Sequence, residues 1–131
     1  MAVEFTKSQQ AAIEARGQNI LVNAGAGAGK TATLVERVFR LLADQDQPVS
    51  LDNMLIVTFT RAAAGEMRER LSLKIHDALT EAYQVGADEK YIRQLRAQLN
   101  ILPRAQISTL HSFCLRLLRE NSTLIGLPPD F

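Results

Sequence analysis

Eight consecutive residues near the N-terminus have the types and the spacing needed to bind phosphate groups. They match the P-loop pattern except that alanine replaces its first glycine: Ala24, Gly25, Ala26, Gly27, Ala28, Gly29, Lys30 and Thr31. In such a turn, backbone N–H groups converge on phosphate oxygens at a helix N-terminus, and glycine lets the backbone approach closely. The octet therefore predicts a site for a nucleoside triphosphate.

Lys30 and Thr31 are the two side chains of this loop that we expect to take part in catalysis. The Lys30 ammonium would reach the β- and γ-phosphates, and the Thr31 hydroxyl would ligate Mg²⁺. The alternative is a flexible Gly/Ala linker. A linker does not require Lys-Thr at this offset between an apolar run and an amphipathic segment.

The segments around the loop predict elements that would hold it in place. Thr6 and Gln9 have the spacing of a capping box, which predicts a helix through about residue 15, and Gly17 is a plausible helix stop. The apolar run at 20–22 predicts a buried strand. Helical apolar spacing over residues 30–42 predicts a helix directly after the loop, with Glu36 and Arg40 paired on its outer side.

The rest of the chain continues the alternation. Residues 54–57 and 105–110 predict two more strands. Between them, Thr60 can cap a long helix, Gly86 breaks it, Asp88 can start another and Pro103 ends it, which we interpret as a helical insertion at about 61–103. The basic residues of the long helix are either a solvated face or a binding surface: Arg61, Arg68, Arg70 and Lys74.

A last helix is predicted over residues 111–120, with its inner side formed by Phe113, Cys114, Leu117 and Leu118. Uncharged strands alternating with helices indicate an α/β fold, a parallel sheet with helices on both faces. We expect residues 1–131 to form one domain.

Composition excludes several classes of protein. The 131 residues are 47% hydrophobic and 22% charged, which is typical of a soluble globular protein, and the net charge of +1 gives no global attraction to a polyanion. One cysteine cannot form an internal disulfide. No signal peptide and no apolar run near the ~20 residues of a membrane span is present, so we expect a cytoplasmic protein without membrane association.

Three further motifs occur in a fixed order with the P-loop. They are residues 5–9 (Phe-Thr-Lys-Ser-Gln), 56–63 (Ile-Val-Thr-Phe-Thr-Arg-Ala-Ala) and 107–113 (Ile-Ser-Thr-Leu-His-Ser-Phe). With these motifs the chain resembles superfamily-one DNA helicases of the UvrD/Rep type, and among them the AddA-type helicase subunits of ATP-dependent helicase–nucleases. The resemblance covers nearly the whole chain and implies a RecA-like P-loop NTPase domain.

The resemblance also implies roles for individual residues. Gln9 would recognise the adenine of ATP, although it also has the position to complete the helix cap with Thr6. The turns after two strands would contact single-stranded DNA through hydroxyls, N–H groups and positive charge, without reading sequence. These residues are Thr58, Phe59, Thr60 and Arg61 in the first turn, and Thr109, His111 and Ser112 in the second. Phe59 is equally compatible with a core position, and a lone histidine such as His111 is often structural.

For the whole protein, the resemblance implies ATP-driven translocation on single-stranded DNA, unwinding of duplex DNA, exonuclease activity, a partner B subunit, and a role in double-strand-break repair and recombination. The Asp-Glu pair that such enzymes use to hold Mg²⁺ does not occur at a suitable position before Phe131, and Asp88-Glu89 is a poor candidate. We therefore expect an incomplete motor domain, a fragment that binds nucleotide weakly and does not hydrolyse it. The alternatives are a self-contained P-loop regulatory module and, without a visible acceptor-binding lid, a small-molecule kinase.

Overall fold

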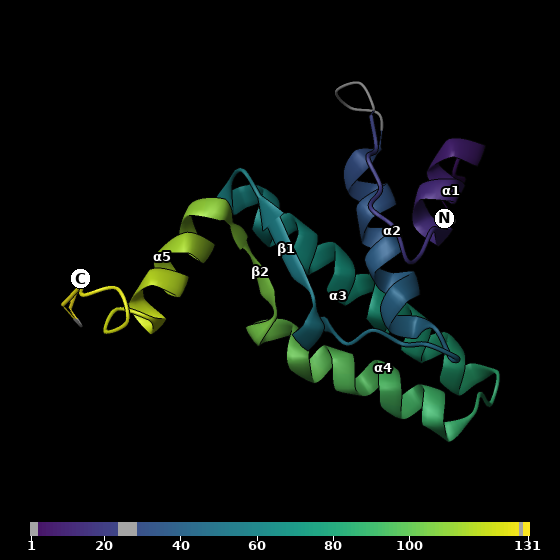
Figure 1. Cartoon of the computed structure of the whole chain (residues 1–131). Helices are drawn as coiled ribbons and strands as arrows, with labels where there is room; N and C mark the ends of the chain where they lie inside the picture. The colour runs from purple at the N-terminus through teal and green to yellow at the C-terminus, as the bar shows by residue number, and fades with distance from the viewer. Residues whose placement is uncertain (1–2, 24–28, 129) are drawn as a thin grey trace.

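The computed structural model describes residues 3–23, 29–128 and 130–131. Their elements follow one another along the chain as α1 (Lys7–Glu14), α2 (Lys30–Ala43), the 3₁₀ turn η1 (Leu51–Asn53), β1 (Leu55–Thr58), α3 (Arg61–Gln84), α4 (Glu89–Ile101), the 3₁₀ turn η2 (Leu102–Arg104), β2 (Gln106–Thr109) and α5 (Leu110–Glu120). Figure 1 shows α5 extending away from the group formed by α1 to α4, with the two chain ends far apart.

Local capping signals set several helix boundaries as predicted. The Thr6 hydroxyl accepts a hydrogen bond from the Gln9 backbone N–H, and the Gln9 side chain accepts one from the Thr6 N–H, so the capping box of α1 is confirmed. Thr60 caps α3 by accepting from the Ala63 N–H, and Asp88 caps α4 by accepting from the Lys90 N–H. These contacts span two or three residues, which is why sequence spacing alone predicts them.

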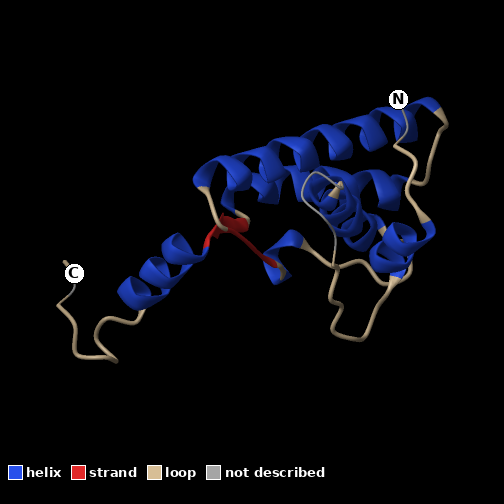
Figure 2. Cartoon of the chain, turned by 90° about the horizontal axis from the view of Figure 1, so that it is seen from above, coloured by secondary structure: helices blue, strands red, loops and turns tan. Residues whose placement is uncertain are grey.

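The two strands form a parallel pair. Leu55 lies opposite Gln106, and Thr58 lies opposite Thr109, so the carboxyl ends of both strands are aligned. A parallel pair requires a long crossover connection, and here α3, α4 and η2 supply it. Figure 2 shows the short sheet lying beside the helices of the crossover.

The core lies where α2, α3 and α4 meet. Leu42, Leu51, Leu71, Ile75 and Leu95 are all completely buried there, and Val35, Val38 and Met67 surround them. On α3 the buried stripe begins at Ala64. The periodic apolar spacing over residues 30–42 thus predicted the face of α2 that packs, because a 3.6-residue period aligns residues three or four apart.

The strand predicted at 20–22 is not formed. These residues carry no regular secondary structure, and the side chain of Leu21 is 93% exposed. A strand needs a hydrogen-bonded neighbour, and residues 20–22 pair with neither β1 nor β2. The sheet of the described residues therefore has two strands, packed against α3, while Leu55 and Val57 are exposed on the other side. The prediction that helices cover both faces of the sheet is wrong for this part of the chain.

The inward face predicted for the last helix is also wrong. None of the residues of α5 is buried, Leu117 and Leu118 are exposed, and Cys114 is an exposed free thiol rather than a core residue. The amphipathic spacing is real, but α5 projects from the end of the sheet (Figure 1), and burial depends on what packs against a face rather than on the face itself.

Glu36 and Arg40 pair as predicted, but only Arg40 lies on the outside. Arg40 Nε lies 2.7 Å from Glu36 Oε1, yet Glu36 is only 6% exposed because α3 covers it and brings Lys74 to its other oxygen. Burial raises the pKa of Glu36, but hydrogen bonds from Lys74 and then Arg40 outweigh it and hold the pKa below its usual value. The carboxylate therefore ties α2 to α3.

Candidate functional site

The predicted phosphate site lies at the start of α2. Residues 24–28 of the loop lie outside the described residues; Gly29, Lys30 and Thr31 follow them. Gly29 is the N-cap of α2 and has a left-handed backbone with φ of 76°, a conformation that favours glycine. Lys30 is exposed and Thr31 half-buried in the first turn. A glycine cap has no side chain to accept from the first N–H groups of the helix, and such an end suits an anion.

Gln9 lies beside this helix end. A Cβ atom added at Gly29 would come within 3.3 Å of the Gln9 amide nitrogen, closer than most real contacts. The space between α1 and Gly29 is therefore too small for a larger side chain unless Gln9 moves. The structure brings together Gln9 and Gly29, two predicted nucleotide-site residues, and it shows that Gln9 also serves the helix cap. The cap role of Gln9 is thus confirmed, and its contact with adenine stays a prediction.

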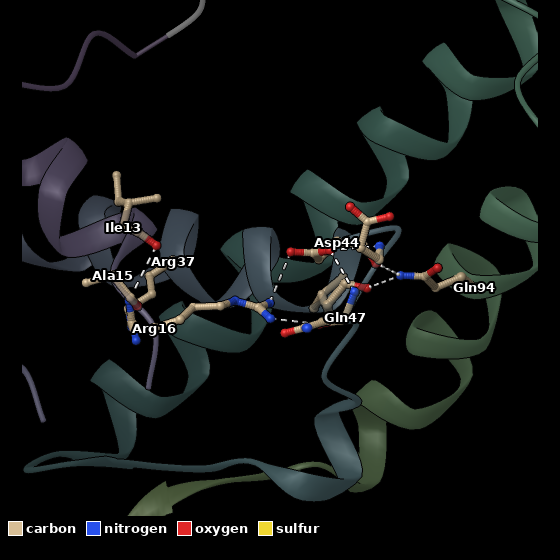
Figure 3. A network of polar contacts seen from close by, with 9 residues as sticks. Ile13, Ala15, Arg16, Arg37, Asp44, Gln47 and Gln94 are labelled. Atoms are coloured by element: carbon tan, nitrogen blue, oxygen red, sulfur yellow. Dashed lines mark hydrogen bonds and ion pairs between the residues drawn. The ribbon is translucent and has the colours of Figure 1, made fainter. Parts of the chain in front are cut away.

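Arg37 holds α1 in this position. From α2, its Nη1 donates to the backbone oxygens of Ala12 and Ala15, both at 2.7 Å, and to that of Ile13 at 3.4 Å (Figure 3). These carbonyls belong to the C-terminal end of α1, where helix oxygens lack intrahelical partners. Arg37 was not among the residues predicted from the sequence. Its place among the apolar positions of α2 is a weak signal, and its partners lie more than 20 residues away.

A second set of polar contacts fixes the far end of α2. Arg16 forms an ion pair with Asp44 at 3.3 Å, and Gln94 of α4 donates to the backbone oxygens of Leu42 and Asp44 at 2.6 and 3.0 Å. Figure 3 shows these contacts continuing from the Arg37 contacts along α2. The helix that begins at the predicted phosphate site is therefore tied to α1 at its middle, through Arg37, and to α4 at its C-terminal end, through Gln94.

A groove runs along α1 next to Gln9. It has a volume of about 730 Å³ and is lined by one face of α1 and by the exposed segment 18–23. Ligand pockets for small molecules and cofactors commonly measure about 300–1,000 Å³. A nucleotide-sized space thus adjoins Gln9, and Ile20, Leu21 and Val22 supply its apolar wall.

The two turns predicted to contact DNA lie side by side. Because Thr58 and Thr109 are partners in the parallel register, the turns that follow them meet at one edge of the sheet. Each turn starts a helix with a threonine cap: Thr60 accepts from Ala63 N–H, and Thr109 from Ser112 N–H at 3.1 Å. Two helix N-termini, with their partial positive charge, therefore converge at this edge.

Most side chains of these turns are available to a ligand, whereas Thr109 is buried, with 9% of its surface exposed. Phe59 is 100% exposed, so it is not a core residue, and Arg61 and His111 are exposed as well. A pocket of about 320 Å³ separates the first turn of α3 from β2 and α5, with Arg61, Ser108, Thr109 and Ser112 in its wall. The Ser108 hydroxyl is buried there without a hydrogen-bond partner. Hydroxyls, N–H groups and a cation at one edge suit a phosphodiester backbone.

The remaining basic residues of α3 are mostly engaged within the protein. Lys74 pairs with Glu36, Arg70 pairs with Glu66 at 2.7 Å, and the half-buried Arg68 donates to backbone oxygens before and within β2. Of the two interpretations of these residues, neither a uniformly solvated face nor a continuous basic binding surface describes them. Arg61, at the predicted DNA turn, is exposed, as is Arg70 beside its partner Glu66.

Two classes of site find no support among the described residues. No three or more His, Cys, Asp and Glu side chains gather there in a way that could hold a metal ion. The carboxylate of Asp88 accepts a hydrogen bond from the Lys90 N–H and so caps α4. This role differs from the Mg²⁺ binding for which Asp88-Glu89 is a poor candidate. None of the helices described has the length and apolar character to cross a bilayer.

Comparison with known proteins places these motifs in a family context. The model of the UvrD/REP helicase N-terminal domain matches residues 5–131. Relatives named as the A subunit of an ATP-dependent helicase/nuclease include that of Exiguobacterium sibiricum, 47% identical over 131 residues, and that of Moorella thermoacetica, 51% identical over 128 residues. The matches cover 100% and 98% of this chain, but 10% and 9% of the relatives. The chain thus spans about a tenth of the length of these proteins.

Proposed function

The chain belongs to the UvrD/REP helicase N-terminal domain family, and we propose that it binds ATP at the start of α2 and single-stranded DNA at the carboxyl ends of β1 and β2. The observation that carries the proposal is the strand register, which aligns Thr58 with Thr109 and so joins two separate motifs into one surface. The fold that we propose for the complete domain is RecA-like.

At the nucleotide site, the proposal assigns each residue a physical role. Residues 24–29 and the first turn of α2 would surround the phosphates with N–H donors, and Lys30 would neutralise the β- and γ-phosphates. Gln9 would bind the adenine edge through its amide, from the side of the groove along α1. Mg²⁺, with Thr31 among its ligands, would supply charge neutralisation of the triphosphate.

At the DNA site, neutral donors and stacking would dominate. Phe59 would stack on a base, while Thr60, Thr109 and Ser112 lie at two helix starts that can receive phosphate groups. His111 is exposed beside them, and Arg61 adds a cation. Such a surface binds single strands of any sequence, as translocation along DNA requires.

For the whole protein, we propose an ATP-dependent helicase and nuclease that works with a second subunit on DNA ends during double-strand-break repair. The names of the relatives support the helicase and nuclease parts of this proposal. We expect no ATP hydrolysis by the 131-residue chain, because the carboxylate pair that orients Mg²⁺ and water is missing from it. DNA-stimulated hydrolysis that Lys30→Ala abolishes would refute that expectation.

Binding measurements on the 131-residue chain test the proposal. Lys30→Ala should lose ATP binding and keep binding to a fluorescent oligothymidylate. Phe59→Ala should keep ATP binding and lose about 1–3 kcal/mol of DNA affinity, the usual value of one stacked base. Leu73→Ala is the matched control, since Leu73 is also an exposed apolar residue but lies about three turns further along α3.

The outcomes separate the alternatives. ATP binding without any DNA binding by the folded chain would favour a P-loop regulatory module and refute the helicase site. Equal losses of DNA affinity in Phe59→Ala and Leu73→Ala would show that the strand does not pass over the turn after β1.

A further inference from the structure

Arg68 connects the two predicted DNA turns through the protein interior. It lies on α3, two turns after Arg61, and its guanidinium reaches three backbone oxygens on the segment that leads into and along β2. Nη1 donates to Leu102, and Nη2 donates to Ile107 at 3.1 Å and to Ala105 at 3.4 Å. These contacts bridge 34 to 39 positions of sequence.

The position of Arg68 matters because its hydrogen bonds add a polar tie to the apolar packing of Ile107 against α3. Each strand has four residues, and a two-stranded sheet is marginal unless a helix supports it. The planar guanidinium has five N–H donors in a fixed fork, so one side chain can hold several carbonyls in a defined arrangement. Ile107, which accepts one of these bonds, lies two residues before Thr109, where the second turn begins.

Arg68 also lines the pocket that separates the turns, together with Arg61 and Ser112. Its donors, however, point to backbone oxygens, and the side chain is half-buried, whereas Arg61 is exposed at the helix start. The two arginines therefore differ in what they can do, since Arg61 has the position to meet a phosphate and Arg68 has the position to set the geometry around it.

We propose that Arg68 is a positioning residue for single-stranded DNA, which holds the turn at 58–61 and the turn at 109–112 at the spacing that one strand can span. The inference rests on the proposed function. A DNA strand can bind both turns at once only when the distance between the turns matches the spacing of its phosphates. Loss of the Arg68 hydrogen bonds should therefore lower DNA affinity without removing a contact to DNA.

Arg68→Gln and Arg70→Gln form a matched pair for the test. Both changes remove one positive charge from the same helix, but Arg70 pairs within α3, with Glu66. In the 131-residue chain, Arg68→Gln should weaken oligothymidylate binding at least tenfold, and Arg70→Gln by less than twofold. ATP affinity should stay within twofold of the wild type in both variants.

Salt dependence and a lysine variant separate positioning from direct contact. A side chain that contacts a phosphate of a single strand contributes about 0.7 to the slope of log affinity against log salt. The slope of Arg68→Gln should equal that of Arg70→Gln. Arg68→Lys keeps the charge but not the fork, so it should remain at least fivefold weaker than the wild type, and it serves as the test variant if Arg68→Gln does not fold.

Hydrogen exchange tests whether Arg68 stabilises β2. The amides of residues 106–109 should exchange faster in Arg68→Gln than in Arg70→Gln, while those of α2 should not change. Unchanged exchange at β2 would show that the Arg68 hydrogen bonds do not stabilise this strand, and would refute the inference.

The other outcomes are equally decisive. Equal DNA affinities of the two glutamine variants would overturn the positioning role. A direct contact to DNA would be indicated instead if Arg68→Lys bound DNA as the wild type does and the salt slope of Arg68→Gln were smaller than that of Arg70→Gln. A loss of ATP affinity in parallel with DNA affinity would also overturn the role. A wild-type chain that binds ATP but no oligothymidylate would refute the proposed function, and this inference with it. A wild type that binds DNA while Arg68→Gln behaves as Arg70→Gln would refute the inference alone.

Discussion

Replacement of Arg37 by methionine should release α1 from α2 while leaving the rest of the fold in place. Methionine keeps an unbranched apolar stem of similar reach, so the change removes the guanidinium and little packing. Nη1 then no longer donates to Ala12 and Ala15, each at 2.7 Å in the structure. The contact to Ile13, at 3.4 Å, is too long to add much.

The expected magnitude follows from these contacts. A hydrogen bond from a charged group contributes about 1.5–3 kcal/mol net, and the half-buried position of Arg37 favours the low end because water can partly replace it. Two such bonds give about 3 kcal/mol. Helix α1 has eight residues, and isolated helices below about 12–15 residues are marginal, so most of this loss should appear as local opening of α1.

Hydrogen exchange followed by mass spectrometry measures that opening. About 3 kcal/mol corresponds to roughly a hundredfold faster exchange, since each 1.36 kcal/mol is about a factor of ten. The acceleration should be confined to residues 7–14, and ATP affinity should fall because Gln9 moves with α1. Arg93→Met, at an exposed arginine of α4, is the matched control. Exchange of α1 within twofold of the wild type would refute the reasoning, as would an equal effect of Arg93→Met.

Two further predictions concern the core and the buried carboxylate. Leu71→Ala should lower the free energy of unfolding by about 2–5 kcal/mol in urea denaturation, because Leu71 is completely buried, whereas Leu73→Ala at an exposed position should change it by less than about 0.5 kcal/mol; similar losses in both would contradict the packing described. Because hydrogen bonds from Lys74 and Arg40 lower the pKa of Glu36 in the folded state, its contribution is present above pH 4.5, its usual pKa, and is lost as the pH falls through the folded-state pKa. Glu36→Gln should therefore show a weaker decline of stability in acid, measured by thermal unfolding at a series of pH values, and an unchanged decline would count against the ion pairs.

Residues that act on near neighbours could be predicted from the sequence. The caps of α1, α3 and α4 were confirmed at Thr6, Thr60 and Asp88, because each contact joins atoms two or three residues apart. The helices predicted from apolar periodicity were also confirmed, because that periodicity likewise depends on residues three or four positions apart. The pairing of two motif turns was foreseeable in outline, since parallel strands end at one edge of a sheet; the register Thr58 to Thr109 makes it specific.

Contacts between distant segments were not predictable from local patterns. Arg37 and Arg68 donate to backbone oxygens, and every residue of the chain offers such an oxygen, so no sequence pattern marks the partner. Burial likewise depended on packing: the apolar run at 20–22 did not form a strand, and the apolar side of α5 stayed exposed. Glu36 was expected outside, and Lys74 on another helix is the reason that it is buried as an ion pair.

The sequence by itself predicts a phosphate-binding loop, and it determined which helices form and where they begin, because these features depend on residue types a few positions apart. The tertiary structure decided that Gln9 lies against Gly29, that the two strand-end turns share one edge, and that Arg37 and Arg68 hold these parts together. The physical reason is range: caps and helical faces are fixed by local geometry, whereas the site is assembled from segments brought together only when the core of α2, α3 and α4 is packed.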